Sequence, residues 1–171
     1  MAAQKFLALV AGRIKEVASI IISAGAGDEG KLVALDASGK IDASVLPTGI
    51  GANVIVLPSS ENLAANDLVN IWNDGGVAKV RKADATAEGK EVHGFVKAGV
   101  ASPANASIYL SGNTITGLTG LTPGARQYLS TTPGLITATA PSAAGNVSQM
   151  IGIASNSTTL IFEPEEPISV A

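Results

Sequence analysis

The side chain with the most catalytic potential in this chain is its only histidine, His93. A hydrolytic role would need a nucleophile or a second base beside it. A zinc site would need further histidines, because the chain has no cysteine. Neither accompanies His93 in the segment Glu91–Val96. We therefore predict a structural histidine, with ring nitrogens hydrogen-bonded locally or to water, and no metal site.

Five carboxylates in the middle of the chain could act as acids or bases: Asp67, Asp74, Asp84, Glu88 and Glu91. They are scattered and lack the D-x-D-x-D-G spacing of a calcium loop. A glycosidase needs two carboxylates fixed across a cleft, usually with aromatic walls, and aromatic residues make up only 4% of the chain. We therefore predict no catalytic residues, no cofactor and no enzyme activity.

Residues Gly25–Lys31 match the G-x-x-x-x-G-K pattern of a phosphate-binding loop. The match fails at Leu32, where Ser or Thr would bind magnesium, and the segment that follows is typical of a strand instead of a helix. Asp28 and Glu29 inside the loop would also repel an anion. We interpret residues 23–30 as a small-residue linker, extended or mobile, and not as a nucleotide site.

Positive charge is concentrated only at Lys79, Arg81 and Lys82, with Lys90 and Lys97 beyond them. In a strand, Lys79 and Arg81 would share one face, which we interpret as solvated in preference to an anion or partner site. The net charge is -3, whereas nucleic-acid binders usually carry a basic stripe. No apolar run reaches the length of a spanning helix. We expect neither nucleic acid nor a membrane as partner.

Turn residues indicate an all-β fold. Charged residues are 15% of the chain, against roughly 25% in an average globular protein, and there are 19 glycines. Thr122–Gly124 and Thr132–Gly134 each place Pro second and Gly third in a turn. Arg126–Ser130 between them is long enough for one strand, and Leu135–Thr139 alternates like a returning strand. This stretch predicts the order turn, strand, turn, strand.

Short strands separated by turn residues are predicted over the rest of the body, with a hairpin at Asn73–Gly76. The predicted strands are 53–57, 67–72, 77–82, 91–100, 106–110, 126–130, 135–139, 146–154 and 158–163. This spacing predicts an antiparallel barrel or sandwich over residues 51–165. Trp72 and Tyr109 are interpreted as core or subunit-contact residues. Because 163–167 is acidic and broken by proline, the C-terminal tail, residues 166–171, is expected to leave the sheet.

Residues 1–50 are predicted to form an extended N-terminal arm. Within it, Lys5–Ile22 admits two interpretations: a short coiled coil with apolar residues three and four apart, or a hairpin turning at Ala11-Gly12. We favour the strands, and the sequence leaves the helix open. Residues 31–42 are interpreted as a second hairpin, turning around Asp36–Gly39.

Lys31–Pro47 resembles a segment that recurs in structural proteins of tailed bacteriophages: head fibres, capsid decoration proteins and tail-fibre stems. The body is similar to the β domain of small phage head proteins at 67–72, 82–86, 93–96, 120–124 and 128–130. The resemblance implies a non-enzymatic virion protein, made in the host bacterial cytoplasm and bound as a homotrimer to the outer capsid surface. Its partners would be the major capsid protein and itself.

By the same resemblance, residues 1–50 would anchor the protein to the capsid or form the trimer, while residues 51–165 would provide the exposed body. The alternative within the same group of proteins is a tail-fibre component that binds a receptor or glycan on the host. No site residues for catalysis, cofactor or metal follow from either interpretation.

Overall fold

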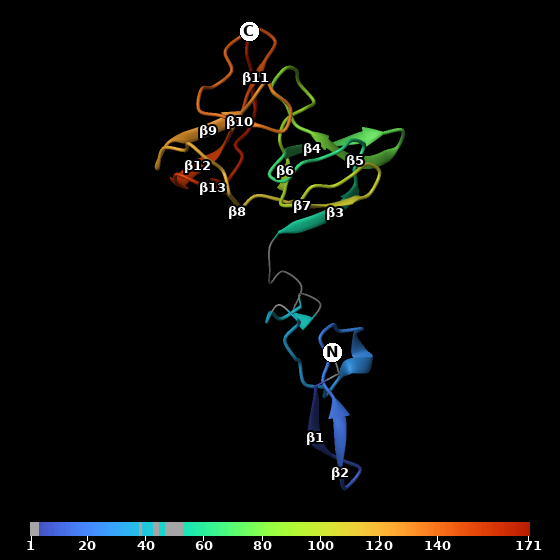
Figure 1. Ribbon diagram of the computed structural model, residues 1–171. Helices are drawn as coiled ribbons and strands as arrows, with labels where there is room; N and C mark the ends of the chain where they lie inside the picture. Colours follow the sequence, from blue (N-terminus) through green and yellow to red (C-terminus); the bar gives the residue numbers. More distant parts are fainter. Residues whose placement is uncertain (1–3, 38, 43–44, 47–52) are drawn as a thin grey trace. The chain divides into compact units, whose positions relative to one another are not determined.

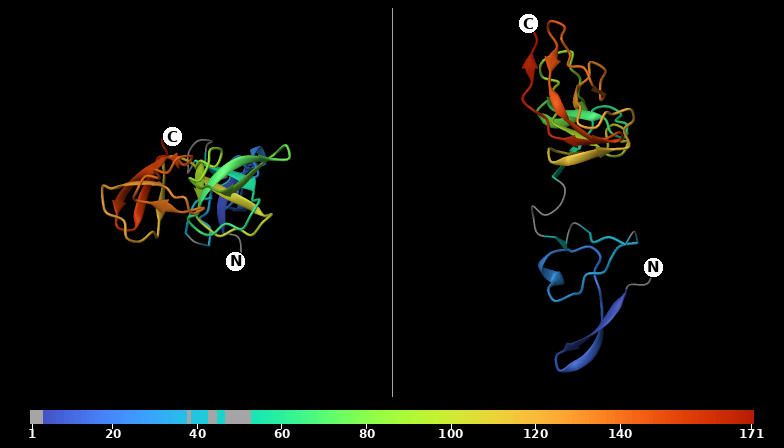
Figure 2. Two further views of the ribbon diagram at one scale, coloured as in Figure 1. Left: turned by 90° about the horizontal axis from the view of Figure 1, so that it is seen from above. Right: turned by 90° about the vertical axis from the view of Figure 1, so that its left-hand side faces the viewer.

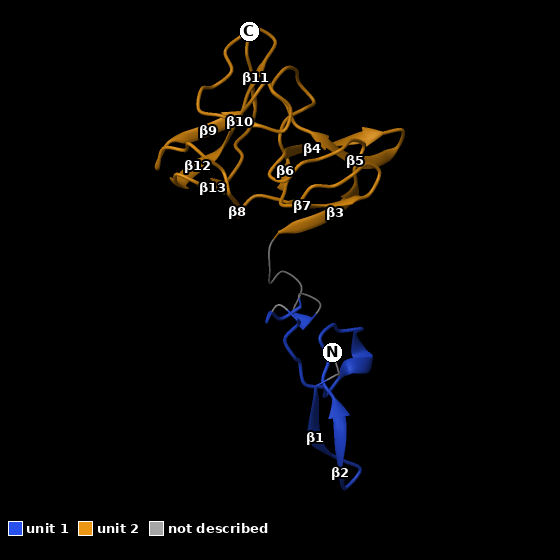
Figure 3. Cartoon of the chain, in the orientation of Figure 1, with its two compact units in different colours: residues 1–51 blue, residues 52–171 orange. Residues whose placement is uncertain are grey.

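The structure is a computed structural model that describes residues 4–37, 39–42, 45–46 and 53–171. The chain divides into two compact units, residues 1–51 and 52–171 (Figure 3). Apart from one short 3₁₀ turn, the regular elements of the described residues are strands, paired mainly in antiparallel sheets (Figure 1). The all-β prediction is confirmed, but the extended course predicted for residues 1–50 is not. The boundary predicted after residue 50 lies outside the described residues.

The first unit begins with an antiparallel hairpin of β1 (Lys5–Val10) and β2 (Arg13–Ala18). Its two turn residues both have positive φ, 51° at Ala11 and 76° at Gly12, as a type I′ turn requires. The hairpin interpretation of this segment is therefore confirmed, and the coiled-coil alternative is wrong. This segment contains several β-branched residues, Val and Ile, which favour a strand over a helix.

The segment after the hairpin is folded by a side chain, so the extended course that the sequence suggested for it is wrong. A 3₁₀ turn, η1 (Ala26–Asp28), is held by the Asp28 carboxylate. One oxygen of Asp28 accepts the Ala24 N–H at 2.6 Å, and the other accepts the Lys31 ammonium at 2.7 Å. Local hydrogen bonding of Asp to its own backbone is a common reason for such turns.

The second hairpin of this unit is present only as a turn. Gly39 N–H donates to the Asp36 carbonyl at 3.0 Å, and Asp36 N–H donates to the Lys40 carbonyl at 2.8 Å. Ser38 within this turn lies outside the described residues. No strand flanks the turn among the residues described, because Val33 instead bridges Ile20 in parallel.

The second unit starts with a five-stranded antiparallel sheet in the order β3-β7-β6-β4-β5. Its strands are β3 (Val54–Pro58), β4 (Leu68–Asp74), β5 (Val77–Lys82), β6 (Gly94–Val96) and β7 (Asn105–Tyr109). The sheet curls, since Ser59 after β3 bridges Val80 of β5, and Ser60 N–H donates to the Val80 carbonyl at 2.9 Å. Val69, Val96 and Ile108 fill its inner side together with Val80.

A second five-stranded sheet lies beside the first, in the order β10-β9-β12-β13-β8 (Figures 1 and 2). Its strands are β8 (Asn113–Thr116), β9 (Arg126–Leu129), β10 (Ile136–Thr137), β12 (Met150–Asn156) and β13 (Thr159–Phe162). Residues of both sheets share one core, in which the rings of Phe95 and Phe162 meet edge to face at 5.2 Å. The unit therefore buries its apolar side chains between the sheets as a sandwich does.

The predicted turn-strand-turn-strand unit is confirmed. Ala125 N–H donates to the Thr122 carbonyl at 3.0 Å and Leu135 N–H to the Thr132 carbonyl at 3.2 Å, closing the two turns. The glycine of each turn has φ of 80°. The second turn also joins the sheets, because the Gly134 carbonyl accepts the Leu68 N–H of β4 at 2.8 Å.

The C-terminal tail does not leave the fold, contrary to the sequence prediction. β14 (Ile168–Ser169) pairs with β11 (Val147–Ser148), and Val170 N–H donates to the Asn146 carbonyl at 2.8 Å. The prolines around residues 164–167 interrupt the chain for only a few residues before pairing resumes. β8 and β14 were not predicted, and the strand predicted for residues 91–100 is limited to β6.

Candidate functional site

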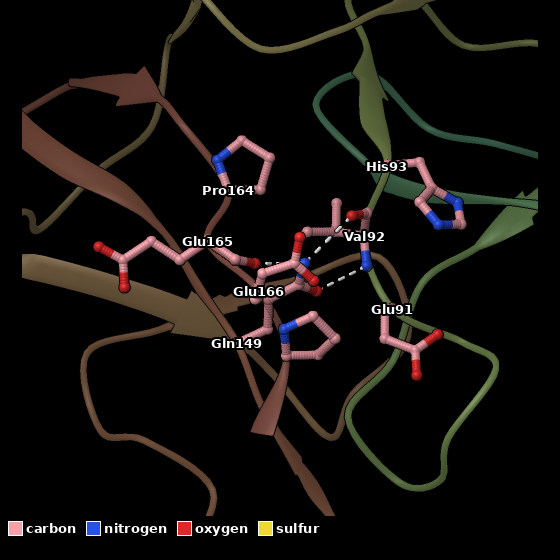
Figure 4. A pocket seen from close by; sticks show the side chains of 8 residues that line it. Glu91, Val92, His93, Gln149, Pro164, Glu165 and Glu166 are labelled. Atoms are coloured by element: carbon pink, nitrogen blue, oxygen red, sulfur yellow. Dashed lines mark hydrogen bonds between the residues drawn. The ribbon is translucent and has the colours of Figure 1, made fainter. Parts of the chain in front are cut away.

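A cleft of about 410 Å³ lies in the second unit, where the segment before β6 faces the segment after β13 (Figure 4). It contains the single histidine. Its lining residues are Glu91, Val92, His93, Gln149, Pro164, Glu165, Glu166 and Pro167. Neither a hydroxyl nor an amine side chain is among them, so the cleft combines one imidazole with three carboxylates and has no Ser, Thr, Cys or Lys nucleophile.

One wall of this cleft is held together by Gln149, which is 4% exposed. Its side-chain oxygen accepts the Val92 N–H at 2.8 Å, while its nitrogen donates to the Val92 carbonyl at 3.3 Å and to the Glu165 carbonyl at 3.1 Å. The amide thus pairs with Val92 as a neighbouring strand would, and it joins segments of both sheets. Its hydrogen bonds are already used within the fold, so it supports the cleft and is not free to bind a ligand.

His93 contributes a donor to the cleft instead of a base. Its Nδ1 accepts the Ile71 N–H at 2.9 Å, with Asn70 Nδ2 3.5 Å away, so in the neutral ring the proton lies on Nε2. Partial desolvation lowers the pKa of His93 below its usual 6.5, and the negative charge of Glu91 offsets part of this effect. The local hydrogen bonding predicted for this residue is confirmed.

The scattered carboxylates are not brought together as an acid–base pair. Asp67, 4% exposed, accepts the Ala64 N–H at 2.8 Å and pairs with Lys82 at 3.1 Å. Asp74 pairs with Lys79 at 2.8 Å. Glu88 accepts the Ser169 hydroxyl and Glu91 accepts the Gly89 N–H. These carboxylates therefore stabilise turns and strand ends.

Asp84 is the most strongly held of the carboxylates. Burial alone would raise its pKa, but hydrogen bonds from the Thr86 hydroxyl and N–H and from Lys90 outweigh burial and lower the pKa below its usual value. Lys90 lies 3.0 Å from the carboxylate. The charge of Asp84 is thus neutralised within its own loop.

The basic residues are likewise engaged within the fold. Lys79 and Arg81 share one face of β5, as predicted, opposite Trp72 and Asn70 of β4. The Arg81 guanidinium lies 4.6 Å from the Trp72 ring centroid and donates to Asn70 Oδ1 at 3.0 Å. Lys97 lies over the ring of Tyr109 at 4.1 Å. Stacking of cations on aromatic rings explains the half-buried positions of Trp72 and Tyr109 without a ligand.

The loop that matches the phosphate-binding pattern is occupied by its own carboxylate. The Lys31 ammonium and the Ala24 N–H both bind Asp28 and lower the pKa of that carboxyl. The helical element in the loop is three residues long, and it offers no long helix terminus to a phosphate. The ammonium of Lys31 and the Ala24 N–H, which a phosphate would need, are thus engaged by Asp28.

The most unusual surface in the molecule belongs to the first unit. Leu7 and Leu9 of β1 and Ile14 of β2 are 74%, 75% and 74% exposed, and Leu9 lies directly opposite Ile14. We call these three residues the hairpin face. The register places all three on one side of the hairpin, and sequence reasoning did not predict that this side is uncovered.

The exposure of apolar side chains extends over the whole first unit. Its exposed large apolar residues are Leu7, Leu9, Val10, Ile14, Ile21, Ile22, Leu32, Val33, Leu35, Ile41 and Leu46. Among its described residues, the only buried apolar one is Ala34. An exposed apolar surface of this kind marks an interaction site more often than a free surface.

No model of a protein family matches the sequence, and no curated protein matches it significantly. In the described part of the chain, no His, Asp or Glu residues gather in a group of three that could hold a metal ion. No helix in the same part is long and apolar enough to cross a membrane.

Proposed function

We propose that this chain is a structural virion protein of a tailed bacteriophage, which binds the outer capsid surface as a homotrimer and stabilises the shell. The observation that carries the proposal is that the two units differ in the exposure of their large apolar side chains. The first exposes eleven large apolar side chains among its described residues, and the second is a sandwich with its own core. One unit is suited to adhesion and the other to a stable external body.

The chemistry of the candidate cleft favours a structural role over a catalytic one. His93 uses Nδ1 to bind the backbone of β4, and Gln149 is engaged on both sides of its amide. Asp67 and Asp84 are likewise engaged in ion pairs of their own. The polar side chains that are buried or have a shifted pKa are therefore bonded within the fold. This is expected of a structural protein, whereas an enzyme would keep some of them available for a substrate.

Stabilisation of a shell by such a protein follows from mass action. A ligand that binds only the assembled lattice shifts the equilibrium toward assembly, as a ligand stabilises a folded protein. Three copies joined together bind with a much higher effective concentration than one copy, so a modest contact with the major capsid protein becomes tight.

The test uses capsids of the parent phage prepared without this protein. The purified full chain is added, unbound protein is removed by sedimentation, and the bound protein is located by electron microscopy. We expect binding to the outer surface and an increase in the temperature at which the capsids release DNA. Absence of binding to such capsids would refute the proposal, and binding to host cells or their polysaccharide instead would favour the tail-fibre alternative.

A further inference from the structure

The hairpin face is apolar on one side of a sheet that has only two strands. Among the described residues, each strand leaves its outer edge without a strand partner, since β1 and β2 form a two-stranded sheet by themselves. On the opposite side of the hairpin, Phe6 and Val17 are partly buried, and Arg13 and Lys15 lie there as well. The hairpin thus has two open edges, one side with two basic residues, and one side that carries the uncovered hairpin face beside the Lys5–Glu16 ion pair. An isolated two-stranded hairpin is marginally stable in water.

The charges of the first unit favour contact between like copies. The chain has 11 basic residues (Lys and Arg) and 14 acidic residues (Asp and Glu). Residues 1–51 contain five basic and five acidic residues. The first unit is therefore neutral, and residues 52–171 carry the net charge of -3. Copies of a neutral apolar unit can meet without electrostatic repulsion, while the bodies repel each other and stay soluble.

The same charge balance argues against other occupants. A nucleic acid or an anionic membrane would select a basic surface, and neither the hairpin face nor the unit as a whole has one. Contacts between unlike, separately folded proteins are about as polar as the rest of the surface, whereas contacts between identical subunits are more apolar. An uncharged patch of Leu7, Leu9 and Ile14 at three-quarters exposure resembles the second class.

We propose that the hairpin face is the contact that joins copies of this chain, with β2 of one copy pairing along the outer edge of β1 of the next. This inference rests on the homotrimer of the proposed function and names its contact. Antiparallel pairing of three hairpins closes a ring of six strands, in which every edge finds a partner. Leu7, Leu9 and Ile14 then point to the interior, where a barrel this small is filled by side chains.

The charged residues of the hairpin fit this arrangement. Arg13 and Lys15 lie on the side that becomes the outside of the ring. Lys5 and Glu16 lie on the inner side, next to Leu7, but they form a 3.0 Å ion pair, so no uncompensated charge is placed there. Closure therefore buries apolar side chains without leaving an unpaired charge.

The first experiment measures the mass of the full chain in solution by analytical ultracentrifugation. We expect the wild type to sediment as three chains, and Leu9→Glu or Ile14→Glu to reduce the mass threefold. Val77→Glu is the matched control, since Val77 is a 52% exposed residue at the start of a strand in the second unit. It should leave the mass unchanged. Near-UV circular dichroism shows whether the second unit remains folded in each variant, because Trp72, Tyr109 and Tyr128 all lie in that unit.

The second experiment does not depend on a disruptive substitution. Because the chain has no cysteine, a single Leu9→Cys provides a unique thiol on the hairpin face. In the closed ring three such thiols converge, so mild oxidation should convert about two of every three chains into covalent dimers. Val77→Cys should remain monomeric under the same conditions. Equal cross-linking of both variants would contradict the proposal.

The outcomes separate this inference from the proposed function. A trimer that Leu9→Glu dissociates, but that does not bind capsids, supports the hairpin contact and refutes decoration. A wild-type chain that is monomeric, or a trimer that survives both Leu9→Glu and Ile14→Glu, refutes the hairpin contact. A monomer that binds capsids through the hairpin face would also refute it, while leaving decoration in place.

Discussion

The two units of this protein differ in the burial of their apolar side chains: the second buries most of them fully or partly, and the first exposes most of them. Where the structure describes them, residues 52–171 place Phe95, Phe162 and their neighbours between two sheets and expose only six large apolar residues. The described part of residues 1–51 exposes eleven, although this unit is less than half as long as the second. The second unit can be stable as a single copy because its core is complete. The first has no comparable core in its described residues, where Ala34 is the only buried apolar side chain, so apolar burial within the unit contributes little to its stability.

The sharpest way to test this difference is to remove a large side chain from each unit. Phe162 is fully buried, and Phe162→Ala should destabilise the second unit by about 3–5 kcal/mol through lost burial and a residual cavity. Leu9→Ala should change the unfolding of that unit by less than about 0.5 kcal/mol, as surface substitutions do. Denaturant unfolding followed by Trp72 fluorescence measures both. If the two variants lose similar stability, the contrast between the units is wrong.

A smaller effect is expected from the amide that joins the two sheets. Gln149→Leu keeps the approximate volume but leaves the buried Val92 N–H and carbonyl without their side-chain partner. We expect a loss of about 1–3 kcal/mol from unsatisfied polar groups. Ser148→Ala, at the preceding half-buried position, is the control and should cost less. An unchanged unfolding midpoint for Gln149→Leu would show that the hydrogen bonds of this amide add nothing to the stability of the second unit.

Titration of His93 provides a pH test confined to the second unit. Its pKa is lowered in the fold, so below about pH 6.5 the unfolded chain binds the proton more readily than the folded chain. Stability should be full above this pH and decrease as pH falls toward the lower folded pKa. His93→Asn offers an acceptor to Ile71 N–H without titrating, and should abolish this decrease. A slope in this window that persists in His93→Asn would assign it to another group.

Asp84 predicts a separate loss at lower pH. Because its pKa is lowered below 3.8 in the fold, its contribution is present above that value and is lost as pH falls through the folded pKa. Asp84→Asn should reduce the loss of stability in this acid range and leave the His93 window unchanged. The two windows can be read from unfolding midpoints measured between pH 2 and 8. A loss unaltered by Asp84→Asn would contradict this assignment.

Local turn chemistry explains which parts of the fold could be predicted. The Thr-Pro-Gly turns at Thr122–Gly124 and Thr132–Gly134 carry their own conformational preference, and both are present. β8 was missed because its four residues lie among Thr and Gly, and β14 because prolines precede it. These strands form through distant pairing, which a local pattern does not specify.

The candidate site was less predictable, for a related reason. His93 was identified as structural because nothing near it in sequence could cooperate in catalysis. The partner of Val92 in the cleft, Gln149, lies 57 residues away, and no local signal connects the two. The residues of the hairpin face alternate with residues of the other side, as they do in any strand, so their spacing does not reveal that this side is exposed. Its exposure depends on the absence of covering residues, which is a property of the folded unit and not of the pattern.

The smallest predicted effect lies in the turn of the first unit and should not reach the second. Ala11 adopts φ of 51°, a left-handed conformation that costs an L-residue with a Cβ roughly 1 kcal/mol but that Asn tolerates well. Ala11→Asn should therefore stabilise the hairpin by about 0.5–1 kcal/mol and slow amide exchange in β1 and β2 a few-fold. Ala78→Asn, at an exposed position in β5, is the matched control. Unchanged exchange would show that the turn does not limit the stability of the hairpin, and faster exchange would show that the turn is not type I′.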